Sequence, residues 1–473
     1  MKTYITNNKK QIIFFSTLLI SIFLLFYYYS INHSDIIWNY NFSKKIAEGY
    51  VPYRDFNVLQ TPLFFYIVSI FLRIFGNTLL TAIIVNLCLA FINCIVMYKI
   101  CMYLSKDQDK SILIIFLYQI LNIIGTVIYY SYNDLCQLFI LITIYLELKN
   151  TKKKCNYIDY ILGLIIGLTI LTKQSVGAIL ALSHVLYILL QKETLKTKVI
   201  TITKRALIAL LVVGTYIFYL YKMDALNDFI DFTILGMKSF DEKNSFFDIS
   251  GLSIYLLVIC LYLTYTAVMQ YKKKKDNNAL TMLVYLIPMI IISYPIFDVI
   301  HFKGVFTLCM IFMIYAVDKI KVNYLLLNII LLLTVSAKVH TQYKNYVYID
   351  SKVYKYLPTM IENKITLEEV TKYILEYEKT GNEIIVVDAI ACFYTIELDR
   401  NYKYFDMLLE GNIGETGEEK VISIIKSKKD KTKFLIRNDY YPDRSQETLK
   451  VINHIKNTYK KVDSIMHFDV YEK

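Results

Sequence analysis

The chain has 473 residues, of which 56% are hydrophobic, and its mean hydropathy is +0.42. This composition is too apolar for a soluble protein and indicates a polytopic membrane protein. The formal charge of +12 does not indicate a nucleic-acid-binding protein, because the lysines gather in short clusters between apolar segments rather than on one basic face. The eight cysteines contain no metal-type CxxC pair, so we expect neither a disulfide framework nor a zinc motif.

The first apolar segment covers residues 12–29, about 18 residues, which is long enough to span a bilayer. Lys2, Lys9 and Lys10 precede it, so the positive-inside rule puts the N-terminus in the cytoplasm and the following loop outside. A cleavable signal peptide is the alternative interpretation. No small-residue cleavage site follows the segment, which favours a retained anchor.

Two apolar segments follow the loop, at residues 62–76 and 78–104. The first is about 14 residues long and is interrupted by Arg73, so it is too short to cross a membrane comfortably. If both segments crossed, every later lysine cluster would lie outside. Because lysine clusters set the orientation, we expect residues 62–76 to lie in the membrane interface instead.

The remaining apolar segments then alternate across the membrane with each lysine cluster inside. We expect about eleven spans in the plasma membrane, with the N-terminus cytoplasmic and the C-terminus extracytoplasmic. The predicted spans are residues 12–29, 78–104, 112–130, 135–148, 158–171, 176–190, 206–221, 252–271, 279–294, 305–317 and 324–337. We therefore divide the chain into a polytopic α-helical transmembrane domain, residues 1–337, with an outer loop at 31–77, and an extracytoplasmic domain, residues 338–473.

The extracytoplasmic domain has the alternating pattern of a small α/β fold. Thr366 and Glu369 form a capping-box pattern at the start of a predicted helix, and Gly381 follows its end. Helices are predicted at residues 366–380, 418–427 and 446–460, and strands at residues 383–389, 433–437 and 464–471. Such alternation predicts parallel strand pairing.

The outer loop contains a short predicted helix and the only tryptophan of the chain. The helix can begin at Ser34 or Asp35 and end at Gly49, with Trp38 and Phe42 on one apolar line at four-residue spacing. We expect this helix to lie along the outer membrane surface with Trp38 at the headgroup level. Asp35 would then be within reach of a lipid-linked phosphate. The alternative is that Asp35 is only an N-terminal charge favoured by the helix dipole.

Short motifs accompany this loop in a fixed order along the chain. They are Asp35 after the first apolar segment, a helix ending at Gly49, Pro-Tyr-Arg-Asp at residues 52–55, a proline-led apolar segment from Pro62 to Phe75-Gly76, Leu-Thr-Lys-Gln at 171–174, and Tyr-Pro-x-x-Asp-x-x-His at 294–301.

In this order the motifs resemble the first extracytoplasmic loop of the GT-C glycosyltransferases. The closest resemblance is to the bacterial family 39 type related to protein O-mannosyltransferases and aminoarabinose transferases. The sequence departs from the pattern of many relatives at two points. Ile36 follows Asp35 where those relatives have an Asp-Glu pair, and Thr61 precedes Pro62 where they have two prolines.

The resemblance implies a GT-C-like fold and an integral membrane glycosyltransferase. Such an enzyme transfers a hexosyl or pentosyl group, with inversion, from a polyprenyl-phosphate-linked donor to a lipid, glycan or protein acceptor of the cell envelope. An acceptor hydroxyl needs a carboxylate to take its proton, and Asp35 is the candidate for this base or for orienting the acceptor. The leaving lipid phosphate needs cations, for which Arg54 and Lys173 are candidates. The alternative for Lys173 is extension of its ammonium to the membrane interface.

Several further residues are candidates for substrate binding. Asp55 is either a second catalytic carboxylate, which positions the sugar or a metal, or only a partner of Arg54. Asp298 and His301 are spaced at i and i+3 and can converge on one ligand. The remaining candidates are Gln174, Lys303, and the polar cluster of Tyr132 and Asp134, for which turn formation is the alternative role.

No cofactor is certain from the sequence, and a divalent metal ion is left as an option. Asp55 and His301 are the residues that would contribute to holding it. A lone Asp/His pair is a weak metal signal, because a divalent ion usually has three or more protein ligands or retains waters.

Three other classes of protein share part of this pattern. A transporter or flippase is disfavoured, because its charged residues tend to lie at mid-depth in paired halves, whereas here they lie at the outer ends of spans. A glycan ligase or polymerase would share most of the features. A non-catalytic membrane anchor would leave the acidic residue of the first outer loop unexplained.

Overall fold

The computed structural model of the chain describes residues 2–29, 34–124, 131–151, 155–236, 246–247, 251–294, 296–297, 301–318, 320–343, 346–408, 412–415, 417–438 and 449–473. Its contacts divide the chain into two compact units, each made of three segments. The helical unit comprises Met1–Ser30, Ile83–Tyr216 and Phe246–Lys344. The loop unit comprises Ile31–Ala82, Ile217–Ser245 and Asn345–Lys473.

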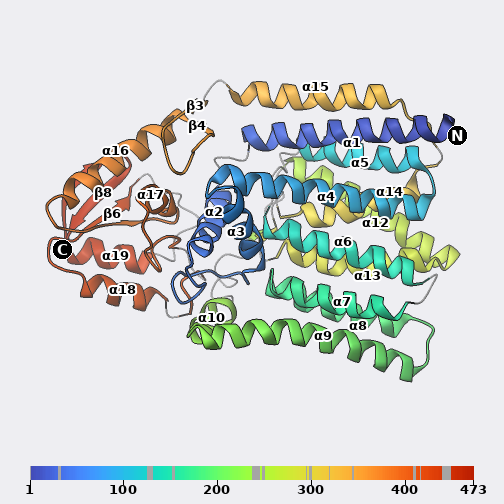
Figure 1. Cartoon of the computed structure of the whole chain (residues 1–473), viewed down its shortest axis with the longest axis horizontal. Helices are drawn as coiled ribbons and strands as arrows, with labels where there is room; N and C mark the ends of the chain where they lie inside the picture. The colour runs from blue at the N-terminus through green and yellow to red at the C-terminus, as the bar shows by residue number, and fades with distance from the viewer. Residues whose placement is uncertain are drawn as a thin grey trace. The chain divides into compact units, whose positions relative to one another are not determined.

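A long helix covers each of the predicted membrane spans (Figure 1). The helices are α1 (Lys2–Tyr29), α4 (Leu79–Ser105), α5 (Gln108–Ile124), α6 (Tyr132–Asn150), α7 (Asn156–Ile170), α8 (Gln174–Leu190), α9 (Leu195–Lys222), α12 (Gly251–Lys274), α13 (Asn277–Ile292), α14 (Lys303–Ala316) and α15 (Tyr324–Tyr343). Among the described residues, Leu79–Ser105, Leu195–Lys222 and Ile254–Lys274 are long and apolar enough to cross a membrane by length and composition. The helical fold class is confirmed, and the number of spans stays a prediction.

Within the helical unit, α1 packs along α15, α12 packs against α14, and α8 packs against α13 (Figure 1). The turn between α7 and α8 depends on a glycine. A Cβ atom at Gly177 would lie 2.3 Å from the backbone nitrogen of Ile170, so only glycine permits this approach. Two short strands, β1 (Phe246–Phe247) and β2 (Ile296–Phe297), pair in parallel.

A buried ionic cluster joins α6, α7, α8, α9 and α13. The Arg205 guanidinium pairs with Glu147 and lies 2.8 Å from Asp159 Oδ1 and 2.8 Å from His184 Nδ1. The Tyr285 hydroxyl lies 3.0 Å from the same His184 nitrogen. His184 is thus a packed polar residue of this cluster.

The loop unit contains α2 (Ser34–Ala47) and α3 (Leu63–Phe75), which pack together. Gly49 follows α2 with φ +98°, as the predicted helix end requires. The apolar helix α3 buries Phe64, Phe65 and Val68 on one side. On its other side Ile74 and Phe75 are 66% and 69% exposed, a composition that suits a membrane interface better than water.

The C-terminal part of the loop unit is an α/β layer. Its strands are β5 (Ile384–Val387), β6 (Lys433–Arg437), β7 (Lys460–Ile465) and β8 (Phe468–Glu472), in the order β5-β6-β8-β7. The helices around them are α16 (Ile361–Glu378), α17 (Cys392–Glu397), α18 (Gly417–Ser427) and α19 (Leu449–Thr458), and the hairpin of β3 (Tyr346–Tyr348) and β4 (Pro358–Met360) precedes them. Two further short helices, α10 (Leu226–Ile230) and the π-helix η1 (Asp231–Leu235), come from the segment after α9.

Three predictions for this layer are wrong in detail. The first helix begins at Ile361, so Thr366 lies within it and is not its cap. The last strand, predicted at residues 464–471, is two strands joined at Met466, whose φ of 48° reverses the chain. Only β5 and β6 pair in parallel, because this hairpin adds β8 and β7 in antiparallel pairing.

The predicted domain boundary at residue 337 falls inside α15. The loop unit also combines most of the outer loop at 31–77 with the C-terminal layer, although the two are far apart in the sequence. The linear division of the chain stays a prediction.

Candidate functional site

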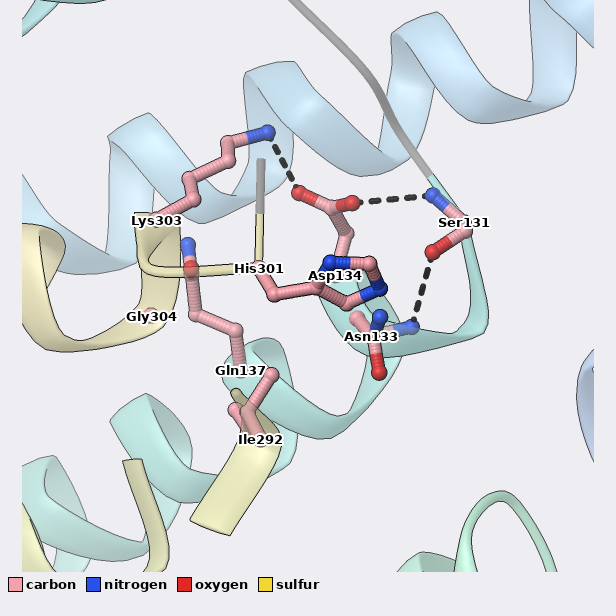
Figure 2. A pocket seen from close by; sticks show the side chains of 8 residues that line it. All are labelled: Ser131, Asn133, Asp134, Gln137, Ile292, His301, Lys303 and Gly304. Atoms are coloured by element: carbon pink, nitrogen blue, oxygen red, sulfur yellow. Dashed lines mark hydrogen bonds and ion pairs between the residues drawn. The ribbon is translucent and has the colours of Figure 1, made fainter. Parts of the chain in front are cut away.

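In the helical unit, Asp134 is the centre of a buried ion pair at the start of α6. The backbone N–H of Ser131 donates to Asp134 Oδ2 over 2.9 Å, so the carboxylate closes a capping box. The Lys303 ammonium, at the start of α14, donates to Asp134 Oδ1 over 2.6 Å (Figure 2). The two side chains are only 4% and 6% exposed. The turn-forming role considered for Asp134 is therefore present together with a second role, the pairing with Lys303.

A cavity of about 10 Å³ lies beside this ion pair, about the volume that one water molecule requires. Figure 2 shows the side chains that line it. They are Ser131, Asn133, Asp134, Gln137, Ile292, His301, Lys303 and Gly304. Three of the predicted substrate-binding residues, Asp134, His301 and Lys303, are thus brought together by the ends of three helices and the segment before α14.

Lys173, just before α8, is bound to the end of α13. Its ammonium donates to the carbonyl oxygen of Ile292 over 2.9 Å and to that of Tyr294 over 3.4 Å. A third acceptor, Asn133 Oδ1, lies at 3.3 Å. The Tyr132 ring lies 5.9 Å from the ammonium.

The alternative considered for Lys173 was an ammonium extended to the membrane interface. Here the ammonium is bonded to acceptors of the protein instead. A cation at the carbonyl end of a helix is favoured by the helix dipole. Lysine has three donors, and each has an acceptor here, so Lys173 could bind a phosphate directly only by exchanging one of these partners.

The remaining predicted residues of the helical unit have different positions. Gln174 is the first residue of α8 and is half-buried, next to Lys173. Asp298 lies outside the described residues, so its spacing with His301 is not tested. Within the described part of the chain, no three His, Cys, Asp or Glu side chains come together as a metal site would require.

A hydrogen-bond network that sequence reasoning missed continues from this cluster into the unit. The Thr307 hydroxyl lies 3.1 Å from Gln137 Oε1 and 3.1 Å from the Tyr118 hydroxyl. Gln137 Nε2 in turn lies 3.3 Å from Asn93 Oδ1. Gln137 is three residues after Asp134, and Thr307 is four residues after Lys303. Gln137 and Thr307 could have been found in the sequence, because each lies one helical turn after a predicted residue and therefore on the same helix face.

In the loop unit, residues 52–55 form a tight turn around a buried tyrosine. Tyr53 has φ +71°, is 0% exposed and packs with its ring centroid 5.1 Å from that of Phe229. Its hydroxyl donates to the carbonyl of Gln60 over 3.0 Å. A non-glycine residue with positive φ is uncommon and persists only where its surroundings hold it.

The same turn presents Arg54 and Asp55 as a two-bond ion pair. Arg54 Nε and Nη2 donate to Asp55 Oδ1 and Oδ2, each over 2.8 Å. The Val51 N–H donates to Asp55 Oδ2 over 2.7 Å. These donors, Arg54 foremost, hold the pKa of the Asp55 carboxyl below its ordinary value, which makes it a weaker base. Asp55 is thus paired with Arg54, its catalytic role stays a prediction, and the Arg54 side chain remains 43% exposed.

Asp35 lies in the first turn of α2 and is half-buried, in the position that favours a negative charge by the helix dipole. The other end of α2 is capped by Arg73 of α3, which donates to the carbonyls of Ala47 and Ile46 over 2.9 and 2.7 Å. The expected place of Trp38 needs correction. Its indole N–H donates to the carbonyl of Ala389 over 3.0 Å, so it contacts the C-terminal layer rather than lipid headgroups.

The comparisons with known proteins agree with this architecture. Residues 59–219 match the sequence model of the dolichyl-phosphate-mannose-protein mannosyltransferase family. No curated protein matches the chain by sequence.

Among solved structures, the chain resembles apo ArnT from Cupriavidus metallidurans, with a TM-score of 0.61, 11% identity and 97% of each chain covered. The same protein bound to undecaprenyl phosphate gives a TM-score of 0.62 at 9% identity, with 98% of each chain covered. The apo oligosaccharyltransferase of Archaeoglobus fulgidus gives 0.52 at 11% identity, with 90% of this chain and 70% of that chain covered.

The predicted resemblance to the GT-C superfamily of membrane glycosyltransferases is thereby confirmed. The family model matches one segment of the sequence, residues 59–219, and the similar structures show the fold over nearly the whole chain.

Proposed function

We propose that the protein transfers a sugar from a polyprenyl-phosphate-linked donor to a lipid, glycan or protein acceptor on the extracytoplasmic face of the plasma membrane. The observation that carries the proposal is the gathering of Lys173, Lys303 and His301 with Asp134 at the predicted outer ends of four helices. Cationic side chains in such a place are unfavourable unless they have partners or a function. A lipid phosphate is the ligand that such cations suit.

The topology belongs to the same proposal. About eleven helices cross the membrane, with the N-terminus cytoplasmic and the C-terminal layer extracytoplasmic, as the lysine clusters require. Undecaprenyl phosphate, the lipid bound in one of the similar ArnT structures, is the carrier against which the donor site is best tested.

The reaction assigns a separate role to each side chain. The acceptor hydroxyl oxygen forms a bond to the anomeric carbon, and its proton passes to Asp35. The bond from that carbon to the phosphate oxygen breaks, and the polyprenyl phosphate leaves with the electron pair. Cations stabilise the charge that develops on this phosphate, and the candidates are Arg54 in the loop unit and Lys173 and Lys303 in the helical unit. Asp55, with its lowered pKa, holds Arg54 rather than taking a proton.

A divalent metal ion stays an option within this scheme. The candidate ligands are Asp55 in the loop unit and, separately, His301 in the helical unit, each together with retained waters. Transfer that survives treatment with a chelator would remove the metal from the proposal.

The test is a transfer assay in membrane extracts with radiolabelled polyprenyl-phosphate sugars. Asp35→Asn should abolish transfer at normal expression. Asp276→Asn is the matched control, because Asp276 caps the start of α13 by accepting from the N–H of Asn278 over 2.9 Å. Full activity of Asp35→Asn would remove the base assignment, and equal losses in both variants would leave only a capping role.

Two further outcomes separate the other classes. Labelled products of increasing length would indicate a polymerase or ligase. A reporter fused after Lys473 tests the topology, and a cytoplasmic signal would contradict the proposed orientation.

A further inference from the structure

Four residues far along the chain hold the turn that carries Arg54. Lys403 Nζ donates to the carbonyl of Arg54 over 2.9 Å, and Asn401 Nδ2 donates to the carbonyl of Asp55 over 3.0 Å. The Tyr404 N–H donates to Asn57 Oδ1 over 2.9 Å. Asn57 Nδ2 donates to the carbonyl of Asn412 over 2.6 Å. We call Asn401, Lys403, Tyr404 and Asn412 the latch residues.

Two latch residues, Asn401 and Lys403, bind the backbone of the turn and not the ion pair itself, and the other two bind the Asn57 side chain. The bonds to Arg54 and Asp55 end on carbonyl oxygens, so the Arg54 side chain keeps its exposure of 43%. Asn57, by contrast, is 1% exposed and uses both its amide nitrogen and its amide oxygen. A turn with a left-handed Tyr53 needs such support, because its conformation is not the one that the chain prefers.

Lys403 also ties this turn to the segment after α9. Its ammonium lies 2.7 Å from Asp228 Oδ2 in α10 and 5.8 Å from the centre of the Phe232 ring. Phe232 and Phe229 are the rings that bury Tyr53. One lysine therefore joins the Arg54 carbonyl to the residues that cover Tyr53.

The adjoining part of the C-terminal layer holds α2 as well. Lys45 of α2 forms an ion pair with Asp406, and the two side chains are 3% and 2% exposed. The Lys45 ammonium lies 5.5 Å from the centre of the Phe56 ring, and Phe56 stacks on Phe42 of α2 with centroids 5.7 Å apart. Residues 401–406 thus hold both the helix that carries Asp35 and the turn that carries Arg54.

We propose that the latch residues act as positioning residues, which hold the Arg54 guanidinium for the phosphate of the lipid donor. The C-terminal layer is then a working part of the donor site, although its latch residues do not touch the donor. This inference rests on the proposed function, because it gives Arg54 a phosphate to bind.

The experiment is a double-mutant cycle on the purified full-length protein in detergent, with undecaprenyl phosphate as the probe. Arg54→Gln removes the charge and should weaken binding roughly tenfold or more, the range of a charge-assisted hydrogen bond. Lys403→Met removes the latch bond and should weaken binding several-fold. The double variant should bind no worse than Arg54→Gln alone, because Lys403 acts through Arg54.

Three matched variants isolate the latch bond. Lys403→Arg should retain affinity. Asp228→Asn removes the ion pair but keeps the bond to the Arg54 carbonyl, so it should lose less than Lys403→Met. Lys428→Met is the control, because it removes a similar ion pair, that of Lys428 with Glu383. The side chains of this pair are 24% and 34% exposed, and those of Lys403 and Asp228 are 24% and 30% exposed. Lys428→Met should bind as the wild type does.

Trp38 is the only tryptophan and contacts the C-terminal layer through Ala389, so its fluorescence reports whether α2 remains in place. Unchanged emission in Lys403→Met, together with weaker binding, is the expected result. If this variant fails to fold, Asn401→Ala removes a single latch bond and carries the same expectation.

The outcomes separate the two proposals. If Arg54→Gln binds the probe as the wild type does, the phosphate role of Arg54 fails, and the positioning role fails with it. If Arg54→Gln is weak but Lys403→Met and Asn401→Ala bind normally, only the positioning role fails. Losses that multiply in the double variant also overturn it, because Lys403 would then act independently of Arg54.

Discussion

The two units hold the ion pairs of their predicted site residues in opposite ways. In the helical unit, Asp134 and Lys303 are almost fully buried and bonded to each other. In the loop unit, Arg54 pairs with Asp55 through two bonds, yet its side chain is 43% exposed. A buried pair fixes structure, and breaking it is destabilising, whereas an exposed pair contributes little to stability and can exchange partners. The comparison indicates that the loop unit supplies an adaptable cation and the helical unit a fixed polar site.

The largest expected effect on stability is that of Lys303→Met. It leaves the Asp134 carboxylate buried without its cation, which typically destabilises a protein by about 3–5 kcal/mol. The thermal midpoint of the purified protein in detergent should fall clearly. The double variant with Asp134→Asn should recover part of the loss, and an unchanged midpoint in the single variant would contradict the comparison.

The next effect is steric and concerns the turn before α8. Gly177→Ala places a Cβ atom 2.3 Å from the Ile170 nitrogen, and such overpacking costs roughly 1–3 kcal/mol. Gly214→Ala in α9 is the control, because nothing lies within 4 Å of its added Cβ. We expect a lower thermal midpoint only for Gly177→Ala. Equal midpoints would mean that α7 and α8 separate without loss.

Arg54→Gln should show the reverse behaviour to Lys303→Met. Its effect on the thermal midpoint should be small, because an exposed ion pair contributes about 0–1 kcal/mol. Its rate of sugar transfer should nevertheless fall strongly. A large loss of stability with an unchanged rate for the folded fraction would assign Arg54 to structure alone and break the contrast between the units.

The smallest effect is a pH dependence of the Arg54–Asp55 pair. The pKa of Asp55 is lowered from 3.8 by Arg54 and the Val51 N–H, so the ionised carboxylate is favoured in the folded state. This contribution is present above the unfolded pKa and is lost as the pH falls through the folded value. The difference in midpoint between wild type and Asp55→Asn should therefore shrink below about pH 4. Asp350→Asn, at an exposed site, should show no such change.

The helices could be predicted from the sequence because lipid demands long apolar segments with internal hydrogen bonds. The helix α2 could be predicted because Gly49 marks its end, and β5 because it is a continuous apolar run. The hairpin at Met466 could not be predicted, because a methionine with positive φ carries no turn signal. The early start of α16 was missed because Thr366 and Glu369 match a capping pattern without being at the helix end.

The candidate site was predictable where motifs marked it and not where distant segments meet. Arg54, Asp55 and Lys173 lie in recognisable motifs, and the pairing of Arg54 with Asp55 follows from their adjacent positions. The pairing of Asp134 with Lys303 spans 169 positions, and the bond from Lys403 to Arg54 spans 349. One sequence contains no signal for such contacts, so the role of the latch residues emerges only from the folded chain.

The most direct test of the central claim follows one labelled sugar on its polyprenyl phosphate carrier in sealed membrane vesicles. We predict that the label leaves the lipid and becomes covalently attached to an acceptor on the extracytoplasmic face, and that Asp35→Asn stops this transfer. Label that crosses the bilayer while still attached to its lipid, with no new covalent product, would contradict the account.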